Sequence, residues 1–453
     1  MKSKILNKFS DKSFKDLFKS SSIVMIAKVF GVILGFITNI IIARNYGADT
    51  VGMVALVNSF ITIVSLFVLF GTNTSILKLI PQYQVKYSIS SSYYLFKKSL
   101  ILVFGLGVLI SILLWFTSPI IAENIFKNSD LVPYFMAASL FIFFISAKEF
   151  NLSALRGLHD IKIFSILNLL PSVLTLVAIS ITTFYFYDKS TPIYIYILVP
   201  ASMFFVTLYF VSKKFKEKLP LIKEENINKI KFNEILLISS PMFLISGMHL
   251  VMSQTDIIMI GMYMSEKDVG LYAIAMKLAL LTSFVLNAVN SVVSPKFSQY
   301  YHANDMETLK KTAKDSSKLI FYTTFPILIF LIIFGKYILG IFGEEFEKAY
   351  LVLVILIIGQ MVNSFSGSVG YFLNMTGNQA IYQKVILVGL FINIILNVLL
   401  IPLYGLIGAA IATSISLALW NLLALLSMKQ KFNFTTVSFG KYYERDTKKN
   451  FYC

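Results

Sequence analysis

The sequence predicts an all-α polytopic membrane protein with twelve transmembrane helices in two six-helix lobes. Hydrophobic residues make up 57% of the 453 positions and charged residues only 14%, a balance that water-soluble chains of this length do not show. Apolar runs of about 20 residues recur along the chain, and each is long enough to cross a hydrocarbon core of roughly 30 Å. The sequence lacks the alternating ten-residue pattern of a membrane β-barrel, so the spans are expected to be helices.

Windows of about 19 residues place six spans in each half of the chain. In the first half they cover residues 22–43, 51–70, 99–122, 131–147, 161–187 and 193–211. In the second half they cover residues 235–264, 269–293, 319–338, 349–372, 381–401 and 406–428. No small-residue cleavage site closes the first apolar run, so this run is expected to be a retained span and not a signal peptide.

Lysine and arginine are distributed unevenly over the two sides of these spans. When basic residues within three positions of a span end are counted with the adjoining connection, the amino terminus, the even-numbered connections and the carboxyl tail hold 32 of the 40 basic residues, and the odd-numbered connections hold six. Because cytoplasmic loops carry an excess of basic residues, both termini are expected in the cytoplasm. Trp115 and the aromatic run at residues 184–196 fall at outer helix ends, where amphipathic rings favour the interface.

This topology divides the chain at its longest polar connection. The expected parts are a cytoplasmic segment 1–20, an amino-terminal lobe 21–212, a cytoplasmic linker 213–234, a carboxyl-terminal lobe 235–428 and a cytoplasmic tail 429–453. The net charge of +17 arises from the lysine-rich connections, so it indicates topology and attraction to anionic lipid, and no nucleic-acid partner is expected. With Cys453 as its single cysteine, the chain has no disulfide of its own and no cysteine cluster for a metal.

The two halves resemble each other in sequence. Four residues of the first half recur in the second at a constant offset of 218: Ser21, Ser22, Val51 and Gly52 match Ser239, Ser240, Val269 and Gly270. With six spans per half, the repeat is parallel and its axis runs along the membrane normal. Any central pathway is therefore expected between the two lobes.

Polar residues spaced 3, 4 and 3 positions apart form one stripe on the otherwise apolar seventh span. These residues are Ser246, His249, Ser253 and Asp256. The equivalent positions in the first span, 218 residues earlier, are Lys28, Gly31, Gly35 and Thr38. Because lipid-facing positions do not tolerate such residues, the two stripes predict a shared water-filled cavity.

Several of these polar residues have a second interpretation. Lys28 lies roughly 7 to 8 Å from the inner end of its span, so its stem is long enough to snorkel to the headgroups. His249 either titrates or forms a hydrogen bond to another helix. The remaining polar residues in the spans bind either sugar hydroxyls or other helices: Asn39, Asn58, Gln254, Asn287, Asn290, Gln360, Asn363, Asn393 and Asn397.

Asp256 and Lys277 lie at similar depths, each about 12 Å below the outer hairpin between spans seven and eight. An isolated charge in hydrocarbon is costly, so the two are expected to form a neutralising ion pair. In the structural interpretation this pair only stabilises the fold. In the functional interpretation the pair faces the cavity, where Lys277 meets a phosphate and Asp256 a proton or sodium ion.

Residues 41–83 carry a recognisable pattern. A basic residue, Arg44, ends span one, the turn "GADTVG" follows, and Gly71 closes span two. This segment resembles the amino-terminal signature of the polysaccharide-synthesis membrane proteins, the Wzx-type flippases. That family belongs to the multidrug, oligosaccharidyl-lipid and polysaccharide exporter superfamily, and the likeness extends over nearly the whole chain in length, span number and repeat.

The resemblance implies an alternating-access transporter and not an enzyme. Its cargo would be undecaprenyl-diphosphate-linked repeat units, moved across the bacterial inner membrane for O-antigen, the glycan of lipopolysaccharide, or for capsule. Lys28 and Lys277 would bind the anionic cargo, with Arg44 near the outer mouth. Asn39, His249 and Gln254 complete the candidate cavity residues, and Asp256 is the candidate for ion coupling. No cofactor is expected, and coupling to a proton or sodium gradient is compatible with the family. A polymerase and a chain-length regulator are the protein partners that the resemblance implies.

Two other functions compete with this one. A drug or metabolite antiporter of the same superfamily would present acidic residues to the amino-terminal cavity, whereas spans one to six contain carboxylates only at their ends, such as Glu149. A membrane-embedded glycan polymerase would need a sizeable catalytic loop with paired acids or a metal motif. Every outer connection in the sequence is short, which disfavours the polymerase.

Overall fold

The computed structural model describes residues 2–185, 187–219 and 230–437, and side chains from residue 23 onward apart from those of Ile245 and His249. Within these ranges the chain is helical and contains no strand. Eight helices are long and apolar enough to cross a membrane, and the number rises to ten if each of two bent helix pairs forms one span. The all-helical membrane architecture expected from the sequence is therefore confirmed.

The first half of the chain forms six α-helices. They are α1 (Lys2–Leu69), α2 (Thr72–Lys86), α3 (Ile89–Ile120), α4 (Val132–Gly157), α5 (Ile161–Tyr185) and α6 (Thr191–Lys218). Two short segments, η1 (Ile121–Ile125) and η2 (Ser129–Leu131), connect α3 to α4. Residues 220–229 of the expected linker lie outside the described residues.

The second half forms seven α-helices. They are α7 (Phe232–Tyr263), α8 (Glu266–Ala279), α9 (Thr282–His302), α10 (Met306–Gly340), α11 (Tyr350–Ser366), α12 (Val369–Met375) and α13 (Gln379–Phe432). A short 3₁₀ segment, η3 (Glu344–Ala349), leads into α11. The bent pairs are the two parts of α7 and the pair α8 and α9. Residues 438–453 of the expected tail, with Cys453, lie outside the described residues.

Two of the long helices are interrupted at a glycine. Gly47 has φ 85° and ψ 173° inside α1, and Gly405 has φ 57° and ψ −134° inside α13. A positive φ is readily adopted by glycine and costs other residues energy. Both breaks fall where the sequence predicts a connection between consecutive spans.

Some helices extend beyond the ends of the predicted spans, and one predicted span is divided. The fourth predicted span ends at residue 147, whereas α4 continues to Gly157; the ninth begins at residue 319, whereas α10 begins at Met306. The tenth predicted span is divided, because Gly367 has φ 64° between α11 and α12. Hydropathy locates the apolar stretch of a helix, but helical hydrogen bonding continues into polar residues at either end.

Large apolar side chains are exposed on many helices. Phe116 is 73% exposed, Phe184 85% and Leu403 72%. Proteins in water rarely expose contiguous apolar surface on this scale. Such side chains are suited to contact with lipid tails, which agrees with the membrane location.

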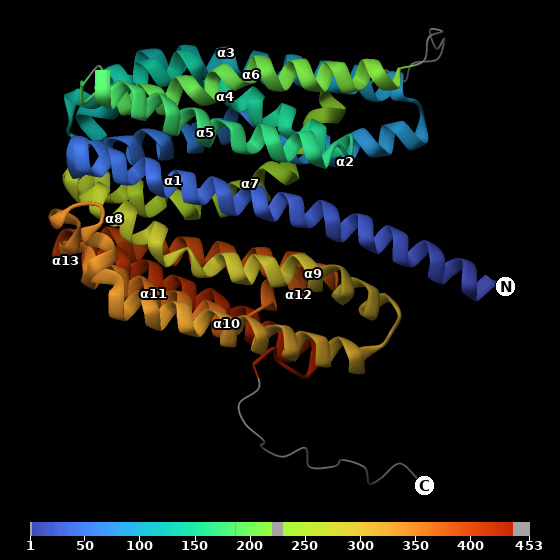
Figure 1. The fold of residues 1–453 in the computed structure, drawn as a ribbon. Helices are drawn as coiled ribbons and strands as arrows, with labels where there is room; N and C mark the ends of the chain where they lie inside the picture. Colours follow the sequence, from blue (N-terminus) through green and yellow to red (C-terminus); the bar gives the residue numbers. More distant parts are fainter. Residues whose placement is uncertain (1, 186, 220–229, 438–453) are drawn as a thin grey trace, which may run out of the picture. The chain divides into compact units, whose positions relative to one another are not determined.

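The described residues divide into two compact units. Unit 1 comprises residues up to Leu278 together with Ile332–Leu356 and Leu390–Thr413. In this unit α4 packs against α3, α6, α2 and α1. Figure 1 shows α3, α4, α5 and α6 running alongside one another. The buried rings of Phe96, Phe150 and Phe215 join α3, α4 and α6, with centroids 5.4 to 5.6 Å apart.

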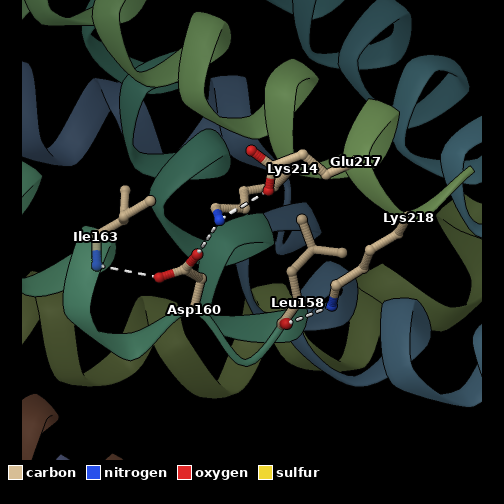
Figure 2. Close-up of polar contacts among 6 residues, drawn as sticks. All are labelled: Leu158, Asp160, Ile163, Lys214, Glu217 and Lys218. Carbon is tan, nitrogen blue, oxygen red and sulfur yellow. Dashed lines mark hydrogen bonds and ion pairs between the residues drawn. The ribbon is translucent and has the colours of Figure 1, made fainter.

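The turn between α4 and α5 is held by the end of α6 (Figure 2). Asp160 accepts a hydrogen bond from the backbone N–H of Ile163 at 3.2 Å, which caps the start of α5. Its other oxygen lies 3.2 Å from the ammonium of Lys214. The ammonium of Lys218 donates to the carbonyl of Leu158 at 3.0 Å. These contacts fix the α4–α5 turn at the lysine-rich end of unit 1.

Unit 2 comprises Ala279–Leu331, Ile357–Gly389 and residues from Ser414 onward. Its core is a cluster of buried apolar side chains on α9, α10, α12, α13 and the segment after α13: Phe297, Leu309, Ala313, Val369, Phe372, Leu373, Val385, Ala424, Met428 and Phe434. The rings of Phe297 and Phe372 meet edge to face at 5.4 Å. This packing holds the short α12 against α9.

Candidate functional site

Asp256 lies at the centre of a buried polar cluster in unit 1. Its carboxylate, on α7, is 4% exposed and accepts hydrogen bonds from four side chains. The donors are Tyr272 at 2.9 Å, Thr413 at 2.5 Å, Asn397 at 2.8 Å and Asn393 at 3.3 Å. Burying an ionised carboxylate is costly unless donors satisfy it. The four donors offset that cost here.

Three further helical segments supply these donors. Asn393 and Asn397 are one turn apart on α13 before the break at Gly405, and Thr413 follows that break. Tyr272 is on α8, where its side chain is fully buried. The sequence pattern marks Asn393 and Asn397, since an i, i+4 pair of carboxamides in an apolar span lies on one helix face. Nothing in the pattern marks Tyr272 or Thr413 as partners of Asp256.

One oxygen of the cluster lacks a hydrogen bond. The side-chain amide of Asn397 donates to Asp256, while its oxygen is buried and has no partner among the described residues. Carboxylate, carboxamide and hydroxyl oxygens are the ligands that hard cations prefer. In the part of the chain that the structure describes, no group of three or more His, Cys, Asp or Glu side chains forms a metal site of another kind.

The ion pair predicted between Asp256 and Lys277 is wrong. The ammonium of Lys277, at the end of α8, instead donates to the side-chain oxygen of Asn39 on α1 at 2.9 Å. Two side chains at equal depth below one hairpin meet only if they also point toward each other. Successive side chains of a helix are rotated by about 100° around its axis, so depth alone does not determine their direction. The charge of Lys277 is therefore satisfied by a neutral carboxamide, and its side chain is partly exposed.

Arg44 is exposed and contacts the carboxyl end of α10. Its Nε donates to the carbonyl of Ile341 at 2.7 Å, and its Nη2 to the carbonyl of Gly340 at 3.4 Å. A cation at this end of a helix satisfies free carbonyl groups and interacts favourably with the helix dipole. These contacts give Arg44 a structural role at the α1–α10 junction.

The other predicted cavity residues are dispersed over unit 1. Lys28 is exposed on α1 and forms no hydrogen bond or ion pair with the described residues. It lies about 16 Å along α1 from Asn39 at 1.5 Å per residue. The oxygen of Gln254 accepts from the hydroxyl of Ser59 at 2.7 Å. The side chain of His249 lies outside the described part of the structure.

Backbones approach closely where α1 passes α8. A Cβ on Gly52 would overlap the carbonyl oxygen of Glu266, and a Cβ on Gly270 would overlap that of Ala48. Glu345 strengthens this contact by accepting from the backbone N–H of Ala48 at 2.8 Å and pairing with Lys267 at 2.6 Å. The crossing requires glycine at both positions, which the sequence repeat places at equivalent sites.

A cavity of about 300 Å³ lies within unit 1. Polar side chains from α1, α2, α4, α6 and α7 line part of it: Asn58, Thr62, Ser65, Asn73, Lys148, Glu149, Tyr196 and Ser246. Lys148 and Glu149 form an ion pair of 2.7 Å. The prediction that Glu149 is terminal is wrong, because α4 continues eight residues beyond it to Gly157. Window hydropathy ends a span at its first charges, although a polar cavity tolerates them.

The family of the chain follows from its sequence. Residues 48–351 match the family model described as polysaccharide biosynthesis protein. The chain belongs to this family. The family predicted from residues 41–83 is therefore confirmed.

Two of the curated relatives of the chain come from an archaeon and a bacterium. The chain is 25% identical to the probable low-salt glycan biosynthesis flippase Agl15 of Haloferax volcanii, over 89% of this chain and 81% of that protein. It is 22% identical to the capsular polysaccharide biosynthesis protein CapF of Staphylococcus aureus, over 64% of this chain and 72% of that protein.

Solved structures resemble the fold over most of its length. The lipid II flippase MurJ, in an inward closed conformation, matches with a TM-score of 0.71 at 20% identity, covering 90% of this chain and 89% of that one. A multidrug resistance transporter of the MATE family in an inward-facing conformation matches with a TM-score of 0.70 at 16% identity, covering 89% and 94%. The chain therefore has the fold shared by these transporters.

Proposed function

We propose that the chain is an alternating-access flippase that moves undecaprenyl-diphosphate-linked oligosaccharide repeat units across the bacterial inner membrane. The glycan would serve O-antigen or capsular polysaccharide assembly. The family, the curated relatives named for glycan flipping and capsule synthesis, and the MurJ-like fold support this activity. The transported lipid would be the substrate, and a polymerase and a chain-length regulator would act on the product.

The observation that carries the proposal is polarity inside the apolar helices of unit 1. Lys277 with Asn39, the Asp256 cluster, and the cavity with Lys148 and Glu149 all lie within or between apolar helices. Polar and ionisable groups inside a membrane are expensive and mark pathways for ions and substrates. A chain that only had to be stable would gain little from them, since apolar replacements of buried charge pairs are often neutral or stabilising.

We propose that Lys277 and Lys28 bind the anionic diphosphate during its passage. An ammonium and a phosphate about 4 Å apart attract each other by roughly 4 kcal/mol at an effective dielectric near 20. The ammonium of Lys277 donates a hydrogen bond to the neutral carboxamide of Asn39, so a phosphate oxygen is able to replace the carboxamide without separating an ion pair. Lys28 is exposed and free of such competition among the described residues.

The Asp256 cluster is proposed as the coupling-ion site. It combines one carboxylate with hydroxyl and carboxamide groups, and the side-chain oxygen of Asn397 is without a partner in the described structure. Coupling-ion sites in secondary transporters are built from such groups inside broken helices. A proton or a sodium ion at Asp256 would change the bonding between α7 and both parts of α13, and so link ion binding to helix movement.

We also propose twelve crossings, two six-helix lobes at residues 21–212 and 235–428, and cytoplasmic termini. Eight long helices and two bent pairs satisfy the length and composition of a span, and the breaks at Gly47 and Gly405 divide α1 and α13. In a Cys453→Ser background, an impermeant maleimide should label Lys189→Cys in intact cells and should not label Asn304→Cys. The opposite labelling would overturn the orientation.

Complementation tests the function itself. A bacterial strain that lacks its own repeat-unit flippase accumulates lipid-linked units on the cytoplasmic side, and the chain should restore glycan at its surface. Asp256→Asn and Lys277→Ala should insert at normal abundance and fail to restore it. Failure of the wild-type chain in strains with several different repeat units, despite normal insertion, would contradict the proposal.

A further inference from the structure

The cavity of unit 1 that Lys148 and Glu149 line contains a cation paired with a carboxylate, and not a cation alone. Lys148 is only 8% exposed, and its ammonium is 2.7 Å from the carboxylate of Glu149. The cavity lining therefore has no net charge from this pair. A phosphate would have to displace Glu149 and leave that carboxylate near its own negative charge, which is unfavourable.

The polar groups of the cavity suit a ligand with hydroxyl groups. Lys148 provides N–H donors and Glu149 provides acceptor oxygens, so a hydroxyl can accept from one and donate to the other. Asn58 adds a carboxamide, which offers both donors and an acceptor.

The size and the apolar surface of the cavity agree with one sugar ring. Its volume of about 300 Å³ is at the lower end of the range of small-molecule sites, which suits a ligand as small as a hexose. Aliphatic side chains and the ring of Tyr196 line the remainder of the wall. A sugar ring has C–H faces as well as hydroxyl edges, so it matches a cavity of this mixed character.

We propose that this cavity binds one uncharged sugar ring of the cargo, apart from the position of the diphosphate. The inference rests on the proposed flippase function and adds a determinant of glycan specificity to it. Lys148 and Glu149 act together as the paired donor and acceptor for ring hydroxyls. The diphosphate is left to the unpaired cations elsewhere in unit 1.

Two fluorescent lipids that differ by one hexose test the assignment. Purified full-length protein is placed in liposomes with an isoprenyl diphosphate that carries either one neutral hexose or none. The measured quantity is the flipping rate of the lipid with hexose divided by that of the lipid without hexose. Thr62→Phe fills the cavity and should reduce this ratio at least tenfold. Lys148→Met and Glu149→Gln should lower the same ratio. Thr323→Phe is the matched control, because this threonine is exposed on α10 and likewise bonds to the carbonyl four residues earlier. An unchanged ratio in Thr62→Phe would overturn the assignment.

Direct binding separates this inference from the proposed function. Saturation-transfer NMR with a neutral methyl hexoside should show transfer from the wild-type protein, no transfer in Thr62→Phe, and no competition by inorganic pyrophosphate. If the wild-type protein flips neither lipid, the flippase proposal fails and the NMR result alone decides the sugar site. Absence of transfer from the wild-type protein, or displacement of the hexoside by pyrophosphate, would overturn the sugar site even where flipping occurs.

Discussion

Gly52 of α1 and Gly270 of α8 meet backbone to backbone: a Cβ on Gly52 would lie 2.9 Å from the nitrogen of Gly270, and a Cβ on Gly270 3.0 Å from the nitrogen of Gly52. Two positions that correspond in the sequence repeat thus pack against each other in unit 1. Small residues at such a crossing let helix backbones approach, which strengthens van der Waals contact inside a membrane.

Gly52→Ala should therefore destabilise the protein. The new methyl group would overlap the carbonyl oxygen of Glu266, and overpacking of this kind costs roughly 1–3 kcal/mol. Gly35→Ala on the same helix is the matched control, because nothing lies within 4 Å of the Cβ it would add. That change should be neutral or stabilising by up to about 1 kcal/mol. Thermal unfolding in detergent measures both; equal midpoints for the two variants would contradict the close crossing.

Lys277→Ala and Lys28→Ala should each block glycan display while the protein inserts at normal abundance. Each removes a cation proposed to hold the diphosphate, and Lys→Arg at either position should largely preserve function because the charge remains. Surface glycan is measured with a specific lectin or antibody, and protein abundance by immunoblot. If both alanine variants work as well as the wild-type chain, neither lysine binds the cargo.

Asp256→Asn should abolish the dependence of transport on an ion gradient. The substitution keeps the size of the side chain and removes the charge at the centre of the cluster formed with Tyr272, Thr413, Asn393 and Asn397. Transport into vesicles is compared with and without an imposed sodium or proton gradient. Asp188→Asn is a control, since this carboxylate lies in the exposed α5–α6 connection. An unchanged gradient effect in Asp256→Asn would remove Asp256 from the coupling mechanism.

The hydropathy of the sequence predicts the helices better than it predicts the partners of their side chains. The breaks at Gly47 and Gly405 follow from turns between apolar runs, which hydropathy detects. The pairing of Asp256 depends on the rotation and packing of α7, α8 and α13, which neither depth nor composition determines. Hydropathy windows do not predict the Lys148–Glu149 pair, because charged residues lower the mean hydropathy of a window even where a cavity accommodates them.

The α5–α6 connection has a predictable pH response. The hydroxyl of Ser190, at 2.5 Å, and its backbone N–H, at 3.1 Å, donate to Asp188 and hold the pKa of that carboxyl below its usual value of 3.8. Because the pKa of Asp188 is lower in the folded protein than in the unfolded chain, its ionised carboxylate stabilises the folded state at pH values above the unfolded-state pKa. This stabilisation is lost as the pH falls through the folded-state pKa. Ser190→Ala should lower the unfolding midpoint slightly at pH 7, and the difference from wild type should shrink below about pH 4. A difference that is constant from pH 7 to pH 3 would contradict this assignment.

Translocation of lipid by the purified protein is the decisive measurement for the flippase function. The wild-type chain is reconstituted in liposomes with a fluorescent undecaprenyl-diphosphate oligosaccharide, and the fraction accessible to an external quencher is followed in time. If the chain is a flippase, quenching should proceed from about half of the lipid, which is the share in the outer leaflet, towards all of it. Lys277→Ala should slow this second phase. Quenching that stops at the same plateau as in protein-free liposomes would contradict it.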